Sequence, residues 1–120
     1  MERPDLDILF VTGDIIGHGL SQDLDGNYSA KTYETLLQVH TNFSNLAAKY
    51  IPNTIILPTI GNNDFRYRYQ GAPTEDYRKS FFGKIFDLWF KNHPANAKAL
   101  NLDLIYGTFI YGGYYRVNLP

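Results

Sequence analysis

The sequence has no cysteine, and this absence excludes several kinds of chemistry. Without cysteine there can be no disulfide, no thiolate metal ligand and no cysteine nucleophile. Long apolar runs are absent too, since none approaches the roughly 20 residues that a membrane-spanning helix needs. No signal peptide stands before the first apolar segment. We therefore expect no transmembrane segment, and the sequence leaves the localisation unknown.

Charge of either sign is also scarce. Lys and Arg total 11 against 12 Asp and Glu, which gives a net charge of −1. A near-neutral chain gives no electrostatic case for nucleic-acid binding. By contrast, 44% of the residues are hydrophobic and 16% are aromatic, including 10 Tyr and 8 Phe. This composition is typical of a globular domain whose rings pack a core or meet carbohydrate or lipid headgroups.

Two short segments end in the same unusual way. Residues 9–18 read LFVTGDIIGH, and residues 55–64 read IILPTIGNND. Each is an apolar, β-branched run that stops at a glycine followed by a metal-capable side chain. Ligands of open α/β sheets gather at the carboxyl ends of the strands. If the two strands are neighbours, their ends are close enough to hold one shared ion site.

The spacing around these segments predicts a parallel β-α-β unit. We expect strands over 7–12 and 54–57, both buried on their two faces. Residues 28–50 between them carry one apolar stripe at helical spacing, which places His40 in the packing. A sheet this small is expected to leave its outer strand edges bare.

The second half of the chain predicts more helix and a third strand. Thr74 is a suitable N-cap for a helix that Asn92-His93-Pro94 ends, which makes His93 a helix-end residue. A short helix is expected over 96–104. Three glycines then break the chain, and 114–119 alternates as a strand. The predicted fold class is therefore α/β.

Three ordered motifs carry a resemblance to a known family. Residues 12–18 (TGDIIGH) resemble T-G-D-I-x-x-H, residues 61–64 (GNND) resemble G-N-H-[DE], and 111–117 (YGGYYRV) resemble a G-G-[FY]-Y strand. Together they resemble calcineurin-like metallophosphoesterases, most closely the acid sphingomyelinase-like phosphodiesterase branch. The resemblance implies an α/β sandwich of which residues 1–120 form a central fragment, with domain portions missing upstream and downstream. It also suggests a secreted or lysosomal parent protein.

The resemblance implies a site with two divalent metal ions, most often Zn²⁺ in this branch. Asp14 matches the aspartate that bridges the two ions, and Asn62 matches a neutral amide ligand of the second. Two ions so held clamp a phosphoryl group and activate water. Each residue also has a plain alternative, because Asp14 can cap a turn and Asn62 follows a glycine in strong turn chemistry.

Further roles come from the same motifs. His18 matches a histidine near the scissile phosphate, a place for a proton donor, although a loop histidine alone is more often solvated. Asn63 stands where the family has a catalytic histidine, and an amide cannot carry a proton. Asp64 either orients its neighbours or caps the turn. Arg66 and Arg68 either receive a substrate headgroup or lie in a solvated loop.

The rest of the family's ligands are missing. Neither an upstream D-x-H nor a downstream G-H-x-H occurs in the 120 residues. We therefore expect a metal-dependent hydrolase of a phosphodiester, either a small molecule or a lipid headgroup, whose isolated chain is inactive because two ligands cannot preorganise two ions. The alternative is a degenerate, non-catalytic module of the same fold that binds a partner through its tyrosine-rich surface.

Overall fold

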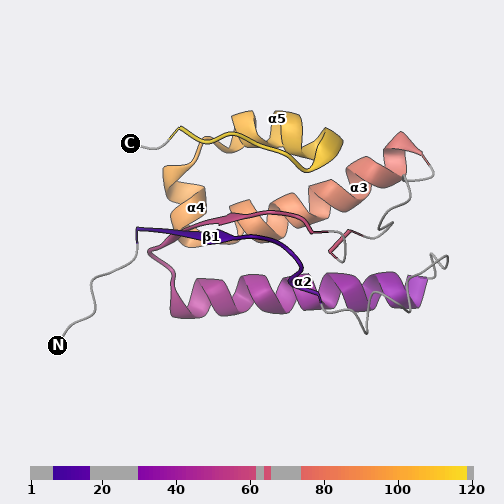
Figure 1. The fold of residues 1–120 in the computed structure, drawn as a ribbon, viewed down its shortest axis with the longest axis horizontal. Helices are drawn as coiled ribbons and strands as arrows, with labels where there is room; N and C mark the ends of the chain where they lie inside the picture. The colour runs from indigo at the N-terminus through magenta and orange to yellow at the C-terminus, as the bar shows by residue number, and fades with distance from the viewer. Residues whose placement is uncertain (1–6, 17–29, 62–63, 66–73, 119–120) are drawn as a thin grey trace.

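The computed structural model describes residues 7–16, 30–61, 64–65 and 74–118 of the chain. It is a small mixed α/β domain (Figure 1). In chain order its elements are β1 (Ile8–Val11), α2 (Ala30–Tyr50), β2 (Ile55–Pro58), α3 (Glu75–Phe86), the π-helical turn η1 (Asp87–Lys91), α4 (Pro94–Ala99) and α5 (Leu102–Gly112). The expected α/β class is confirmed at this level.

The two strands pair in parallel, as the β-α-β pattern predicts. The register joins Ile8 to Ile55 at one end and Val11 to Pro58 at the other. The ladder continues past the strand ends, because the Thr59 N–H donates to the Val11 carbonyl at 2.8 Å. Parallel pairing puts the carboxyl ends of β1 and β2 side by side.

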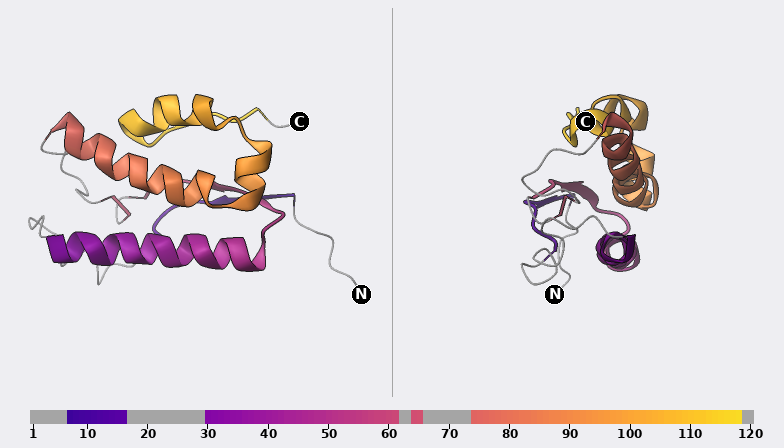
Figure 2. Two further views of the ribbon diagram at one scale, coloured as in Figure 1. Left: turned by 180° about the vertical axis from the view of Figure 1, so that it is seen from behind. Right: turned by 90° about the vertical axis from the view of Figure 1, so that its right-hand side faces the viewer.

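Burial on both faces is correct for most of β2 but wrong for β1. Ile56, Leu57 and Pro58 are buried, whereas Phe10 of β1 is 69% exposed. Figure 2, in its view along the molecule, shows the helices gathered to one side of the two strands. Among the described residues nothing covers Phe10, whereas the other residues of β1 are half-buried.

Phenylalanine rings and one tryptophan form the aromatic half of the core, which isoleucines and leucines complete. Phe109 of α5 is central, with ring centroids 5.6 Å from Phe90 and 5.7 Å from Phe82. Ring pairs at such distances add about 0.5–1.5 kcal/mol beyond burial. The buried aromatic residues are Phe81, Phe82, Phe86, Trp89, Phe90 and Phe109. Several tyrosines remain on the surface, namely Tyr50, Tyr77, Tyr106, Tyr111 and Tyr114.

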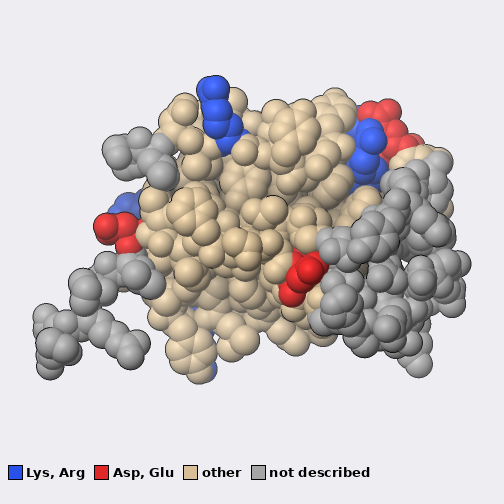
Figure 3. Space-filling model, viewed as in Figure 1, with Lys and Arg blue, Asp and Glu red and all other residues tan. Residues whose placement is uncertain are grey.

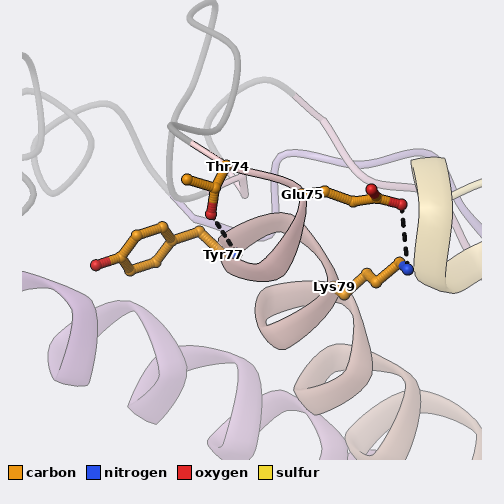
Figure 4. Close-up of polar contacts among 4 residues, drawn as sticks. All are labelled: Thr74, Glu75, Tyr77 and Lys79. Atoms are coloured by element: carbon orange, nitrogen blue, oxygen red, sulfur yellow. Dashed lines mark hydrogen bonds and ion pairs between the residues drawn. The ribbon is translucent and has the colours of Figure 1, made fainter.

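The start of α3 follows the predicted cap. The Thr74 hydroxyl accepts a hydrogen bond from the Tyr77 N–H at 3.2 Å (Figure 4). Glu75 in the first turn pairs with Lys79 at 3.1 Å, one turn further on. The cap satisfies an amide that helix geometry leaves unpaired, and the acidic first turn suits the positive end of the helix dipole.

The helix does not end at α3 but widens into η1. The Asn92 N–H donates to the Asp87 carbonyl at 3.0 Å, an i to i+5 bond. A π-turn changes the angular spacing of the side chains. Trp89 and Phe90, which are adjacent in sequence, are both buried in this turn. His93 and Pro94 then start α4, so the expected helix stop at 92–94 is confirmed.

The short helix expected over 96–104 is wrong, because two helices meet there. α4 ends at Ala99, and Asn101 caps α5 by accepting the Leu104 N–H at 3.2 Å. Gly107 lies inside α5 instead of breaking the chain. Glycine weakens a helix by about 1 kcal/mol, and burial of Ile105 and Phe109 on either side offsets that loss.

The third strand expected over 114–119 is also wrong for its described part, 114–118, which carries no ladder. The reason lies in the outer edge of β2. Asn96 imitates a neighbouring strand there: its side chain accepts the Ile56 N–H and donates to the Ile56 carbonyl, both at 2.8 Å. Pro58 has no N–H, and its carbonyl accepts the Tyr115 hydroxyl at 2.5 Å. This edge is therefore closed to a further strand, contrary to the expectation of a bare edge.

Candidate functional site

The site begins where the two strands end. Gly13 has φ +100° and Asp14 has φ +54°, so the chain turns sharply after β1. A Cβ on Gly13 would lie 2.9 Å from the Gly61 nitrogen, and a Cβ on Gly61 would lie 2.2 Å from Asp14 Oδ1. Only glycine permits so close an approach of backbone and carboxylate. The two motifs thus meet in space, as predicted.

Asp64 ties the two strand ends together. Its Oδ2 accepts the Asp14 N–H at 2.7 Å and the Gly61 N–H at 2.8 Å, and its Oδ1 accepts the Ile16 N–H at 3.0 Å. The side chain is fully buried. Hydrogen bonds to a carboxylate are about twice as strong as neutral ones. One side chain therefore fixes the backbone on both sides of the site.

Asp64 is also bonded twice to Gly61. Its own N–H donates to the Gly61 carbonyl at 3.1 Å, and its carboxylate accepts the Gly61 N–H. The same carboxylate holds the main chain of Asp14 across 50 positions of sequence. A role for Asp64 beside a metal ion stays a prediction.

Most of the other predicted site residues lie outside the described part of the chain. These are His18, Asn62, Asn63, Arg66 and Arg68. Gly61, which immediately precedes Asn62 in the sequence, lies against Asp14. Within the described ranges no group of three or more His, Asp or Glu side chains gathers as a metal site would. The ligand roles of Asp14 and Asn62 remain predictions.

His40 belongs to the same arrangement, although the sequence indicated only a packed histidine. It is fully buried in α2, and its Nε2 lies 3.2 Å from the Asp64 carbonyl. Burial lowers the pKa of His40, because a charged imidazole loses its hydration there. The sequence offers one sign of this role, a polar residue on an apolar helical stripe, but it does not show which residue His40 would bind.

Two of the larger cavities border the sheet, and neither is lined by Gly13, Asp14, Gly61 or Asp64. One of about 650 Å³ lies at the amino ends of the strands and is lined by Asp7, Asn53, Lys98 and neighbouring apolar residues. Another, of about 370 Å³, lies between the strands and the C-terminal segment. Its lining includes Phe10, Leu57, Thr59, Tyr114 and Tyr115. We call this second cavity the aromatic groove.

Comparisons with known proteins leave the family unassigned. No protein-family model, no curated protein and no solved structure matches the chain. In the part of the chain that the structure describes, no helix is both long and apolar enough to cross a membrane. The interpretation of the site therefore depends on its geometry and on the motif resemblance.

Proposed function

We propose that this chain is part of a metal-dependent phosphoesterase that hydrolyses a phosphodiester with metal-activated water. The observation that supports this most is the contact between the Asp14 carboxylate and Gly61, the residue before Asn62. The two residues proposed as metal ligands come from the ends of neighbouring parallel strands. A carboxylate and an amide oxygen there are suitable donors for a divalent cation.

The donor set of the described chain fits a cation better than it fits a phosphate. The amides of Asp14, Ile16 and Gly61 all point into the Asp64 carboxylate, so they are not free to bind an anion. In our proposal Asp14 and Asn62 hold divalent ions, Zn²⁺ most readily, and these ions when bound supply the charge that polarises the phosphoryl group. His18 protonates the leaving oxygen, and Asn63 donates a hydrogen bond to phosphate. Arg66 and Arg68 face the headgroup.

The positive φ of Asp14 makes this assignment testable without disturbing the fold. Asparagine adopts the left-handed region as readily as aspartate. Asp14→Asn therefore removes the charge while keeping the backbone turn. Asp103, exposed in the first turn of α5, supplies a matched Asp→Asn control far from the strand ends in the fold.

The proposal predicts a ternary complex of chain, cation and diester. With Mn²⁺ and dimethyl phosphate as probes, ³¹P relaxation of the diester should be enhanced beyond the effect of Mn²⁺ alone. The enhancement should disappear in Asp14→Asn and persist in Asp103→Asn. Equal enhancement in both variants would refute the assignment. Turnover of bis(p-nitrophenyl) phosphate is expected to be undetectable, because the 120 residues lack the D-x-H and G-H-x-H ligands that the resemblance implies.

The aromatic groove favours a second candidate, a non-catalytic binding module. Phe10 and Tyr114 are 69% and 63% exposed beside it. The described part of the face in Figure 3 carries few charges. Exposed rings around a groove suit an apolar partner surface. If neither Mn²⁺ nor the diester binds, this candidate replaces the first.

A further inference from the structure

His40 carries a polar bond where packing alone would favour an apolar side chain. It lies in the middle of α2, on a stripe whose other members include Tyr33, Leu36 and Phe43. The carbonyl oxygen of Asp64 can only accept a hydrogen bond, so His40 Nε2 must carry the proton and donate. Because burial also lowers the pKa of His40, the ring at neutral pH is the uncharged Nε2–H tautomer.

In this tautomer the other ring nitrogen, Nδ1, is an acceptor with no hydrogen-bond partner among the described atoms. It is also buried. An unpaired buried polar atom costs about 1–3 kcal/mol. A leucine at this position would avoid that loss. The bond to Asp64 must therefore provide something that an apolar side chain cannot.

The acceptor is the residue on which both strand ends depend. The Asp64 carboxylate receives the amides of Asp14, Ile16 and Gly61, and the only described side-chain bond to its main-chain carbonyl comes from His40. Trp89 of η1 packs edge-on against the imidazole, with centroids 5.8 Å apart. The ring is thus held by α2 and η1 while it holds Asp64.

We propose that His40 is a positioning residue for the strand-end site. By fixing the main chain at Asp64 it sets where the Asp64 carboxylate lies, and so sets the backbone of Gly61 and of Asp14, whose carboxylate is the proposed cation ligand. The effect of His40 on cation binding rests on the proposed function, whereas its effect on the order of the backbone does not. Removal of a group bonded directly to a metal ligand typically lowers metal affinity by 10–100-fold, and His40 acts one residue further away, so we expect the lower end of that range.

His93 is a matched control inside the same molecule. It is also buried, and its Nε2 also donates to a backbone carbonyl, that of Ile51, at 3.2 Å. Its bonds join the start of α4 to the connection between α2 and β2, away from the carboxyl ends of the strands. Loss of either histidine should destabilise the fold, but only loss of His40 should disturb the site.

The experiment compares His40→Leu, His40→Gln and His93→Leu in the ¹⁵N-labelled chain. In His40→Leu, native-state hydrogen exchange of the Asp14, Ile16 and Gly61 amides should accelerate more than the global unfolding free energy explains. Mn²⁺ affinity, read from line broadening at those amides, should fall about tenfold. His40→Gln, which keeps a donor, should recover part of both effects. His93→Leu should change neither beyond its global destabilisation.

Two results would overturn the proposal. One is an equal response of the three amides to His40→Leu and His93→Leu. The other is the Nδ1–H tautomer of His40 in the wild type, because the proposal requires ring ¹⁵N shifts at neutral pH to show the Nε2–H tautomer. This measurement decides the matter even if a variant fails to fold. Absence of Mn²⁺ binding in the wild type would reject the proposed function alone, because the exchange measurement still decides the role of His40.

Discussion

Replacing Asp64 by Asn tests whether one carboxylate joins the two strand ends. An Asn side chain has a single acceptor oxygen. Turned to keep the Asp14 and Gly61 bonds, it points its NH₂ group at the buried Ile16 N–H. The unsatisfied donor costs about 1–3 kcal/mol, and each of the two remaining bonds weakens by about 1 kcal/mol on losing the charge. Since a neutral amide is easier to bury, the net loss of unfolding free energy should be about 2–4 kcal/mol.

The assay is urea unfolding followed by fluorescence of Trp89, the only tryptophan and a buried one. Asp87→Asn is the control, because Asp87 is exposed and pairs only loosely with Lys91 at 3.8 Å. It should change the unfolding free energy by less than about 0.5 kcal/mol. A loss for Asp64→Asn below about 1 kcal/mol, with an unchanged m value, would refute the reasoning.

Three other predictions follow from the same contacts. Gly61→Ala should destabilise the fold by about 2 kcal/mol or more, because its Cβ would strike Asp14 Oδ1. Gly107→Ala should stabilise the fold by about 0.5–1 kcal/mol, since nothing lies within 4 Å of the new methyl group. Thermal melts in which both variants shift the melting temperature in the same direction would contradict this. Asn96→Ala should lower the unfolding free energy by about 3 kcal/mol or more, because it leaves the N–H and the carbonyl of Ile56 unpaired. Asn101→Ala, which removes only a helix cap, should lower it by about 1 kcal/mol. If urea unfolding shows the larger loss for Asn101→Ala, the edge of β2 does not need Asn96. Burial lowers the pKa of both His40 and His93 in the folded chain. As the pH falls below about 6.5, these histidines therefore bind protons in the unfolded chain before they do so in the folded one. The unfolding free energy should be unaffected above that pH, and below it should drop by up to about 1.4 kcal/mol per pH unit for each histidine. His40→Gln should flatten that slope between pH 7 and 5.5, and an unchanged slope would contradict the assignment.

The elements that the sequence predicted well are those with local signals. The β-α-β unit follows from two short apolar runs and one helical stripe, and the start of α3 follows from Thr74 with acidic residues behind it. These patterns depend on neighbours within a few positions, so they survive without knowledge of the tertiary structure.

The failures come from contacts between distant residues. The alternation after Gly113 is real, since Tyr115 and Val117 are half-buried while Tyr114 and Arg116 are exposed. It nevertheless forms no strand, because Asn96 occupies the edge of β2 from 40 positions away. Nothing in the local sequence of either segment indicates that partnership.

The candidate site also has a part that the sequence predicts and a part that it does not. The meeting of Asp14 with the segment 61–64 could be predicted, because parallel strands bring their carboxyl ends together. The three amides that converge on Asp64, and the support that His40 gives it, could not, since a buried hydrogen-bond network leaves no periodic signal in the sequence. His18 and Asn63 stay predictions from the motif alone.

The most direct test of the central claim is a Mn²⁺ titration of the ¹⁵N-labelled chain, read at the amide of Gly61. If the strand ends form a cation site around Asp14, this signal should broaden early in the wild type and in Asp103→Asn, and should stay sharp in Asp14→Asn at the same Mn²⁺ concentration. Broadening that is unchanged by Asp14→Asn, or that first appears far from Asp14 and Gly61, would contradict the account.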